Sequence, residues 1–131
     1  VVQVVRTLLD RVANTVDLGS VATLVGLAGT VTTLTAEALH LESYQPHYID
    51  GARLSVAQIL EAVDFMVRSP REVRSARGYM HPGRVDVIGA GAIVWGEIVQ
   101  RVAAEVTARG GEMTHAITSE RDILDGIALT A

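Results

Sequence analysis

The sequence of 131 residues contains no cysteine. This excludes disulfide bonds and cysteine-ligated zinc and is consistent with a cytoplasmic protein. Only 4% of the residues are aromatic although 49% are hydrophobic, so one domain with an aliphatic core of moderate size is expected. No apolar run reaches the roughly 18 residues of a membrane span. The longest candidate, Val87–Trp95, is short and is flanked by Asp86 and Glu97.

Lysine is also absent, so all 11 basic side chains are arginines, and the formal net charge is −4. An acidic balance argues against a general nucleic-acid binder. The planar arginine fork suits phosphate oxygens, but a GC-rich genome also replaces lysine by arginine, and this simpler cause is favoured. The chain has no signal-peptide pattern and begins without Met inside a helical pattern, which indicates a fragment of a longer protein.

Apolar spacing predicts alternating helices and strands. Helices are expected over Val1–Val16, Thr30–Leu39, Val56–Met66, Ser69–Gly78 and Arg84–Arg109, followed by a last helix that Ser119 caps. Ser55 and Gln58 form a capping box before the third of these. Buried strands are expected at Ala22–Leu27 and Met113–Thr118, whereas 40–53 is predicted to be loop. The predicted fold class is α/β, helix-rich, with only two strands.

The stretch GLAGTVTTL, residues 26–34, joins the first strand to a helix. A strand, a glycine turn and a helix start together suit an anion, because Gly29 lets a phosphate approach the backbone and the first helical N–H groups point at it. The hydroxyls of Thr30 and Thr32 are candidate further donors. The alternative is an ordinary strand-to-helix connection with a threonine N-cap, and local chemistry alone favours that alternative.

A second glycine cluster, Gly89, Gly91 and Gly96, does not fit a cofactor loop. A dinucleotide fingerprint requires its third glycine at Val94, and a phosphate loop requires lysine where Glu97 stands. These glycines are predicted to let a long helix pack closely against its neighbours. The four histidines show no metal-ligand spacing, so no metal site is predicted.

Arginines crowd into a short region and include Arg74, Arg77 and Arg84. Arg71, Arg74 and Arg77 follow one another at a spacing of three, which places them broadly on one side of a short helix. This is either a solvated basic face, which is the favoured interpretation, or a local patch that attracts polyanions.

Three motifs resemble the exopolyphosphatase / guanosine pentaphosphate phosphohydrolase family. GLAGTVTTLTA (26–36) is similar to G-x-A-G-T-x-T-T-L-A, HPGRVDVIGAGAIV (81–94) to P-G-R-x-D-V-I-x-A-G, and SERDILDGIAL (119–129) to S-x-x-G-L-R-E-G-L. They occur in the family's order and spacing. The sequence departs from the family at Asp50-Gly51, where the family tends to have His-Gly, and in the terminal motif, where the family's Gly and Arg are replaced.

The resemblance implies a two-lobe actin-like (ribonuclease H-like) hydrolase that removes terminal phosphate from polyphosphate or guanosine pentaphosphate with Mg²⁺. Residues 1–131 then form the C-terminal portion of its second lobe. The catalytic Glu and the other glycine loops are expected upstream, so the chain alone is predicted to be inactive. The expected phosphate-binding residues are Gly29, Thr30, Thr32, Arg74, Arg77 and Arg84.

The expected partners are the substrate and the upstream lobe of the same protein, with a homodimer as a further option and with neither nucleic acid nor membrane. A competing interpretation is a non-catalytic module of the actin-like fold that senses polyanions or docks a partner. The two glycine loops and the Glu expected upstream distinguish an enzyme from such a module.

Overall fold

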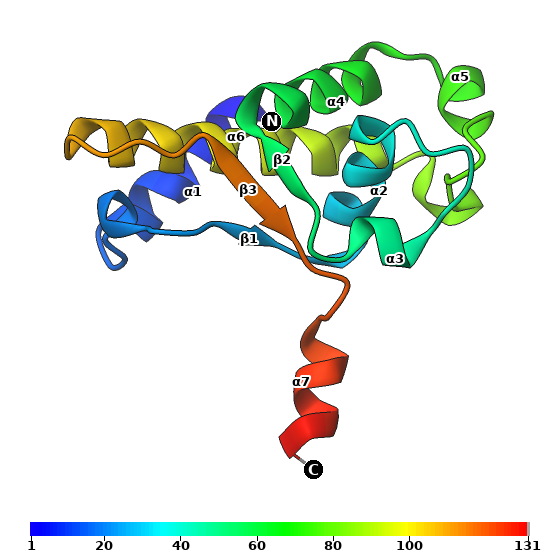
Figure 1. Ribbon diagram of the computed structural model, residues 1–131. Coiled ribbons are helices and arrows are strands. Elements are labelled where there is room, and N and C mark those ends of the chain that lie inside the picture. The colour runs from blue at the N-terminus through cyan, green and yellow to red at the C-terminus, as the bar shows by residue number, and fades with distance from the viewer. Residues whose placement is uncertain (131) are drawn as a thin grey trace.

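The computed structural model describes residues 1–130 and shows helices around a small mixed sheet (Figure 1). The strands lie in the order β1-β3-β2. β1 (Val25–Gly26) is parallel to β3 (His115–Thr118), and β2 (Arg53–Ser55) is antiparallel to β3. The α/β, helix-rich fold class and the two parallel strands are confirmed. The predicted number of strands is wrong, because the described residues form three.

The third strand lies at the end of the segment that was predicted to be loop. That segment also contains a short helix, α3 (Pro46–Ile49), and Gly51 turns the chain between them with a φ of +77°. β2 is only three residues long, and Leu54 is its one buried residue. Such a strand is too short to show the alternation of apolar and polar side chains that identifies strands in a sequence.

The predicted helices are present with shifted ends. They are α1 (Val2–Ala13), α2 (Ala28–Ala38), α4 (Val56–Arg68), α5 (Arg71–Ser75), α6 (Ile88–Ala108) and α7 (Ile123–Thr130), with short 3₁₀ turns at η1 (Leu18–Ser20) and η2 (Pro82–Arg84). The capping box before α4 is confirmed, since the Ser55 hydroxyl accepts from the Gln58 N–H and the Gln58 side chain accepts from the Ser55 N–H. Within residues 1–130, no helix is both long and apolar enough to cross a bilayer.

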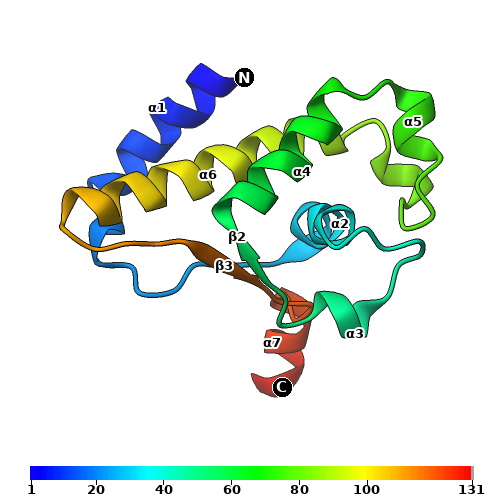
Figure 2. The same cartoon turned by 45° about the horizontal axis from the view of Figure 1, so that its top comes forward.

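Helices α2, α4 and α6 pack together on one side of the sheet, and their apolar residues form the core (Figure 2). The glycines of α6 make this packing close. A Cβ on Gly91 would lie 2.6 Å from Oγ1 of Thr30 in α2, and a Cβ on Gly96 would lie 3.2 Å from Cγ1 of Val63 in α4. The prediction that these glycines serve helix packing is therefore confirmed for Gly91 and Gly96, whereas a Cβ on Gly89 would meet the Arg74 side chain.

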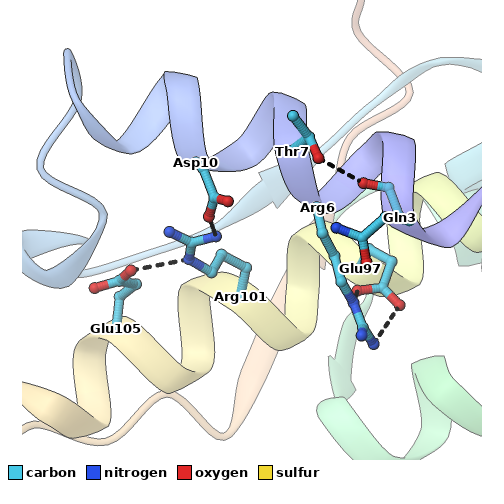
Figure 3. A network of polar contacts seen from close by, with 7 residues as sticks. All are labelled: Gln3, Arg6, Thr7, Asp10, Glu97, Arg101 and Glu105. Atoms are coloured by element: carbon cyan, nitrogen blue, oxygen red, sulfur yellow. Dashed lines mark hydrogen bonds and ion pairs between the residues drawn. The ribbon is translucent and has the colours of Figure 1, made fainter.

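Helix α1 lies along the outer side of α6 (Figure 3). Arg6 pairs with Glu97 at 3.0 Å, and Asp10 pairs with Arg101 at 2.7 Å. Exposed ion pairs contribute little to stability, so the attachment rests mainly on apolar side chains that α1 buries, such as Leu9.

Candidate functional site

Helix α2 starts in a way that the sequence did not predict. It begins at Ala28, two residues before the expected start at Thr30, and its N-cap residue Leu27 offers no side-chain cap. The left-handed backbone of this turn belongs to Ala28, with a φ of 75°, and not to Gly29. The predicted threonine cap is wrong. By helix geometry, the first N–H groups of α2, which include those of Gly29 and Thr30, have no carbonyl partner within the helix.

The threonines of α2 use their hydroxyls inside the helix. Thr32 and Thr33 donate to the carbonyl of Gly29 at 3.2 and 2.7 Å. This back-bonding lets threonine side chains be buried with their polar atoms satisfied. The Thr30 side chain lies against Gly91 of α6. The Thr32 hydroxyl is therefore engaged with the protein's own backbone, whereas the Thr30 side chain packs against α6.

Arg84 lies directly over the start of α2, although 55 positions separate it from Gly29 in the sequence. A Cβ added to Gly29 would lie 2.5 Å from Cζ and 2.9 Å from Nε of Arg84. The same guanidinium donates a long hydrogen bond, 3.5 Å, to the Thr33 hydroxyl. Gly29 is thus required for close approach, and the group that approaches is an arginine.

The turn before α6 positions this arginine. In η2, the ring Nδ1 of His81 accepts from the N–H of Gly83 at 3.0 Å, and Pro82 fixes the first turn position. Arg84 follows as the last residue of the turn and is half-buried. His81 therefore caps the η2 turn.

The electrostatics of this arrangement favour an anion. The N-terminus of a helix carries a partial positive charge, which stabilises negatively charged groups and destabilises positively charged ones. Arg84 adds a full positive charge at that end of α2. A phosphate placed there would receive charge-assisted hydrogen bonds from the guanidinium and from backbone N–H groups.

Tyr44 and Glu120 border the same end of α2. The Tyr44 hydroxyl donates to Oε1 of Glu120 at 2.6 Å. Burial and the Glu120 carboxylate raise the pKa of Tyr44, while the nearby Thr32 hydroxyl and the charge of Arg84 oppose this rise. These two residues were not predicted, since they lie in loops and only the fold brings them together.

Arg77 lies at the other end of α2. Its Nη2 is 3.3 Å from a carboxylate oxygen of Glu37, and its guanidinium stacks over the Phe65 ring at 4.3 Å. Glu37 also accepts from the Tyr79 hydroxyl at 2.8 Å. Gly29 and Glu37 are eight residues apart, so about 12 Å of helix separates their backbones. The structure therefore does not bring Arg77 together with Arg84.

The surroundings of Arg77 are acidic. A hollow of about 400 Å³ beside it is lined by Glu37, Gln58, Glu61 and Phe65, among others. A polyanion entering this hollow would meet two carboxylates and one arginine that is already paired.

Arg74 lies at a third place, over Gly89 in the first turn of α6. Its Nη1 is 3.2 Å from the position of a Cβ on Gly89, and its buried Nε has no hydrogen-bond partner among the described residues. Arg71 pairs with Asp86 at 2.7 Å. The arginines that share one side of the predicted short helix thus lie in different surroundings, and only Arg71 and Arg77 have ion-pair partners among the described residues.

No group of three or more His, Asp or Glu side chains converges to hold a metal ion within residues 1–130. Magnesium prefers oxygen ligands such as carboxylates. The part of the chain that the structure describes thus offers no cluster that fits the Mg²⁺ implied by the family resemblance.

Known proteins match both the sequence and the fold, although no protein-family model matches the chain. Exopolyphosphatase 2 of Mycobacterium tuberculosis is 43% identical over 128 residues, which make up 98% of this chain and 39% of that relative. The crystal structure of an exopolyphosphatase-like protein has a TM-score of 0.94 at 40% identity and is matched over 98% of this chain and 40% of its own. A Ppx/GppA family member from Aquifex aeolicus has a TM-score of 0.69 at 27% identity, over 86% of this chain and 36% of its own.

The helix-rich fold with its small mixed sheet is that of part of an actin-like domain. The more particular similarity is to the exopolyphosphatase / guanosine pentaphosphate phosphohydrolase (Ppx/GppA) family, as the three motifs predicted, and both sequence and structure confirm it. The chain spans about two fifths of the length of the exopolyphosphatases that it matches.

Proposed function

We propose that the chain is the C-terminal portion of the second lobe of a phosphatase that hydrolyses terminal phosphoanhydride bonds of inorganic polyphosphate or guanosine pentaphosphate. The names of its relatives support this substrate class. The observation that carries the proposal is the position of the Arg84 guanidinium against Gly29 at the start of α2.

The chemistry of this site suits the substrate. Phosphoryl transfer spreads negative charge over phosphate oxygens, and catalysis depends mainly on positioning and on electrostatic stabilisation of that charge. Arg84 supplies a planar set of donors, and the N–H groups of Gly29 and Thr30 supply fixed backbone donors. Thr32 and Thr33 hold the carbonyl of Gly29 and so fix the orientation of this turn.

The general base and the remaining phosphate loops belong, in this proposal, to the upstream lobe. Without a base and without the opposing loops, water is neither activated nor aimed at the phosphorus. The Mg²⁺ of the proposal would neutralise phosphate charge, but the described residues hold no ligand cluster for it. No step is therefore assigned to a metal on this chain. A phosphate-binding role of Arg74 and Arg77, a cytoplasmic location and a homodimer stay predictions.

The experiment is a phosphate-release assay with the full-length parent and with this chain alone, on long-chain polyphosphate and on guanosine pentaphosphate, with Mg²⁺. We expect turnover by the parent and none above background by the chain. Turnover by the chain alone would show that catalysis does not require the upstream lobe. A parent that binds polyphosphate but turns over neither substrate would support the alternative, a polyanion-sensing module.

A further inference from the structure

The Tyr44 hydroxyl lies beside the start of α2 and donates its proton to a carboxylate there. Its acceptor is Oε1 of Glu120 at 2.6 Å, which is the length of a strong charge-assisted hydrogen bond. Burial and Glu120 raise the pKa of Tyr44, and the Thr32 hydroxyl and the charge of Arg84 act against this rise from close by. The Thr32 hydroxyl itself is 3.2 Å from the carbonyl of Gly29. The Tyr44 hydroxyl is thus within one side chain of the proposed phosphate site.

The sheet brings Glu120 to the same place. Strands β1 and β3 are parallel, so the segments that follow them leave the same edge of the sheet (Figure 1). The turn into α2 follows β1, and Ser119 and Glu120 follow β3. The Ser119 N–H donates to the carbonyl of Gly26 at 2.9 Å, and the Glu120 N–H donates to Oδ1 of Asp50 at 2.9 Å. The backbone of Glu120 is therefore fixed beside the start of α2.

Glu120 adds a negative charge at a place that otherwise suits an anion. A phosphate held by Arg84 and by the N–H groups of Gly29 and Thr30 would lie near the Glu120 carboxylate, and like charges at short range repel each other. The Tyr44 hydroxyl has a single proton, so it donates either to the carboxylate or to a phosphate oxygen. The phosphate and Glu120 therefore compete for the same hydrogen-bond donor.

We propose that a phosphate oxygen of the substrate replaces Glu120 as the acceptor of the Tyr44 hydroxyl, so that Tyr44 contacts phosphate and Glu120 acts as a built-in competitor. This inference rests on the proposed phosphate site at Arg84. One hydrogen bond to an anion replaces another of the same kind, so the exchange costs little free energy. When phosphate leaves, the hydroxyl returns to Glu120. The competitor thus favours product release, a step that limits the turnover of many enzymes.

The exchange predicts a specific pattern of affinities for phosphate. Glu120→Gln should bind phosphate at least about threefold more tightly, because a neutral amide oxygen accepts the Tyr44 hydroxyl more weakly than a carboxylate does. Tyr44→Phe alone should change the affinity little, since it removes both of the bonds that exchange. The double variant Tyr44→Phe/Glu120→Gln should bind like Tyr44→Phe, because no hydroxyl is left for which the two anions compete.

Calorimetric titration of the full-length parent with orthophosphate, at one pH and one ionic strength, measures these dissociation constants without turnover. Arg84→Met reports on the site itself and should bind at least about tenfold more weakly. Glu42→Gln is the matched control, because it removes the same charge from an exposed residue of the loop that carries Tyr44. It should bind orthophosphate as the wild type does. Thermal unfolding of each variant reports whether its fold is retained.

Two kinds of result overturn the exchange alone. One is an unchanged affinity in Glu120→Gln. The other is a gain that is equally large in Glu42→Gln or in the Tyr44→Phe background, because charge repulsion then explains it without any exchange of the hydroxyl. No binding by the wild type, or binding that Arg84→Met does not weaken, overturns the phosphate site and this inference with it. Failure of the proposed site is thereby distinguished from failure of the exchange.

Discussion

Replacing Gly29 by alanine in the full-length parent should displace Arg84 without disturbing the fold. The new methyl carbon would lie 2.5 Å from Cζ and 2.9 Å from Nε of Arg84, and a contact this short cannot persist. Arg84 has a long, flexible side chain, so the guanidinium moves and the backbone stays. Gly29 does not have the left-handed backbone of Ala28, and alanine is the better helix former by about 1 kcal/mol. We therefore expect unchanged or slightly increased stability.

The expected loss of activity follows from the contact that is removed. A hydrogen bond to a charged group contributes about 1.5–3 kcal/mol, and about 1.4 kcal/mol corresponds to a tenfold change in rate. Loss of the Arg84–phosphate contact in the transition state should therefore lower kcat/KM by roughly tenfold to 150-fold. Phosphate release measures kcat/KM, and thermal unfolding of the same samples measures stability.

A double-mutant cycle tests whether the loss of activity in Gly29→Ala arises from the displacement of Arg84. If the methyl group at Gly29 acts through Arg84, then Gly29→Ala/Arg84→Met should be no less active than Arg84→Met alone. Gly126→Ala is the matched control, because no atom lies within 4 Å of a Cβ at that position, and it should retain full activity. Full activity of Gly29→Ala, or losses that add in the double variant, would refute the role of the Arg84 contact.

Further predictions concern residues away from the start of α2. Tyr79→Phe should lower the free energy of unfolding by about 1–3 kcal/mol, measured by denaturant titration, because it removes a donor from the nearly buried Glu37 carboxylate. Burial and Glu37 raise the pKa of Tyr79 above its usual value of about 10. The unfolded chain therefore loses this proton at a lower pH than the folded protein, so the free energy of unfolding of the wild type should fall as the pH rises above 10. Tyr79→Phe should lose less stability over this range, and parallel curves of stability against pH would contradict the prediction. Arg74→Met/Arg77→Met should weaken polyphosphate binding more at low than at high salt if these arginines bind phosphate, and coincident titrations at low salt would assign both to structural contacts.

Local signals predicted the parts of the fold that depend on local sequence. The Ser55–Gln58 capping box is complete within four residues, so the start of α4 was predictable. Strand β2 was not predictable from the sequence, because it has a single buried residue, Leu54, and is recognisable only from its pairing with β3. The predicted N-cap of α2 was wrong for a related reason. A threonine near a helix start can accept a hydrogen bond from a following N–H as a cap, or it can donate to a preceding carbonyl. Thr33 donates to the carbonyl of Gly29.

The candidate site was predictable only in its separate pieces. Gly29 and Arg84 each stood in a recognisable motif, but only the fold shows that one lies against the other. Arg77 resembled Arg84 in the sequence, because its partner Glu37 lies 40 positions away and gives no local signal. Tyr44 and Glu120 stand in unrelated loops, and nothing in the sequence marks them as neighbours of α2.

A crystal structure of the full-length parent with bound orthophosphate or sulfate tests most directly whether the start of α2 and Arg84 form a phosphate site. We expect the anion at hydrogen-bond distance, about 2.7–3.2 Å, from the Arg84 guanidinium and from the N–H groups of Gly29 and Thr30. The same anion should be absent, or bound more weakly, in crystals of Arg84→Met grown in the same solution. An anion bound elsewhere in the wild type, with Arg84 still lying over Gly29 and the start of α2 empty, would contradict the assignment.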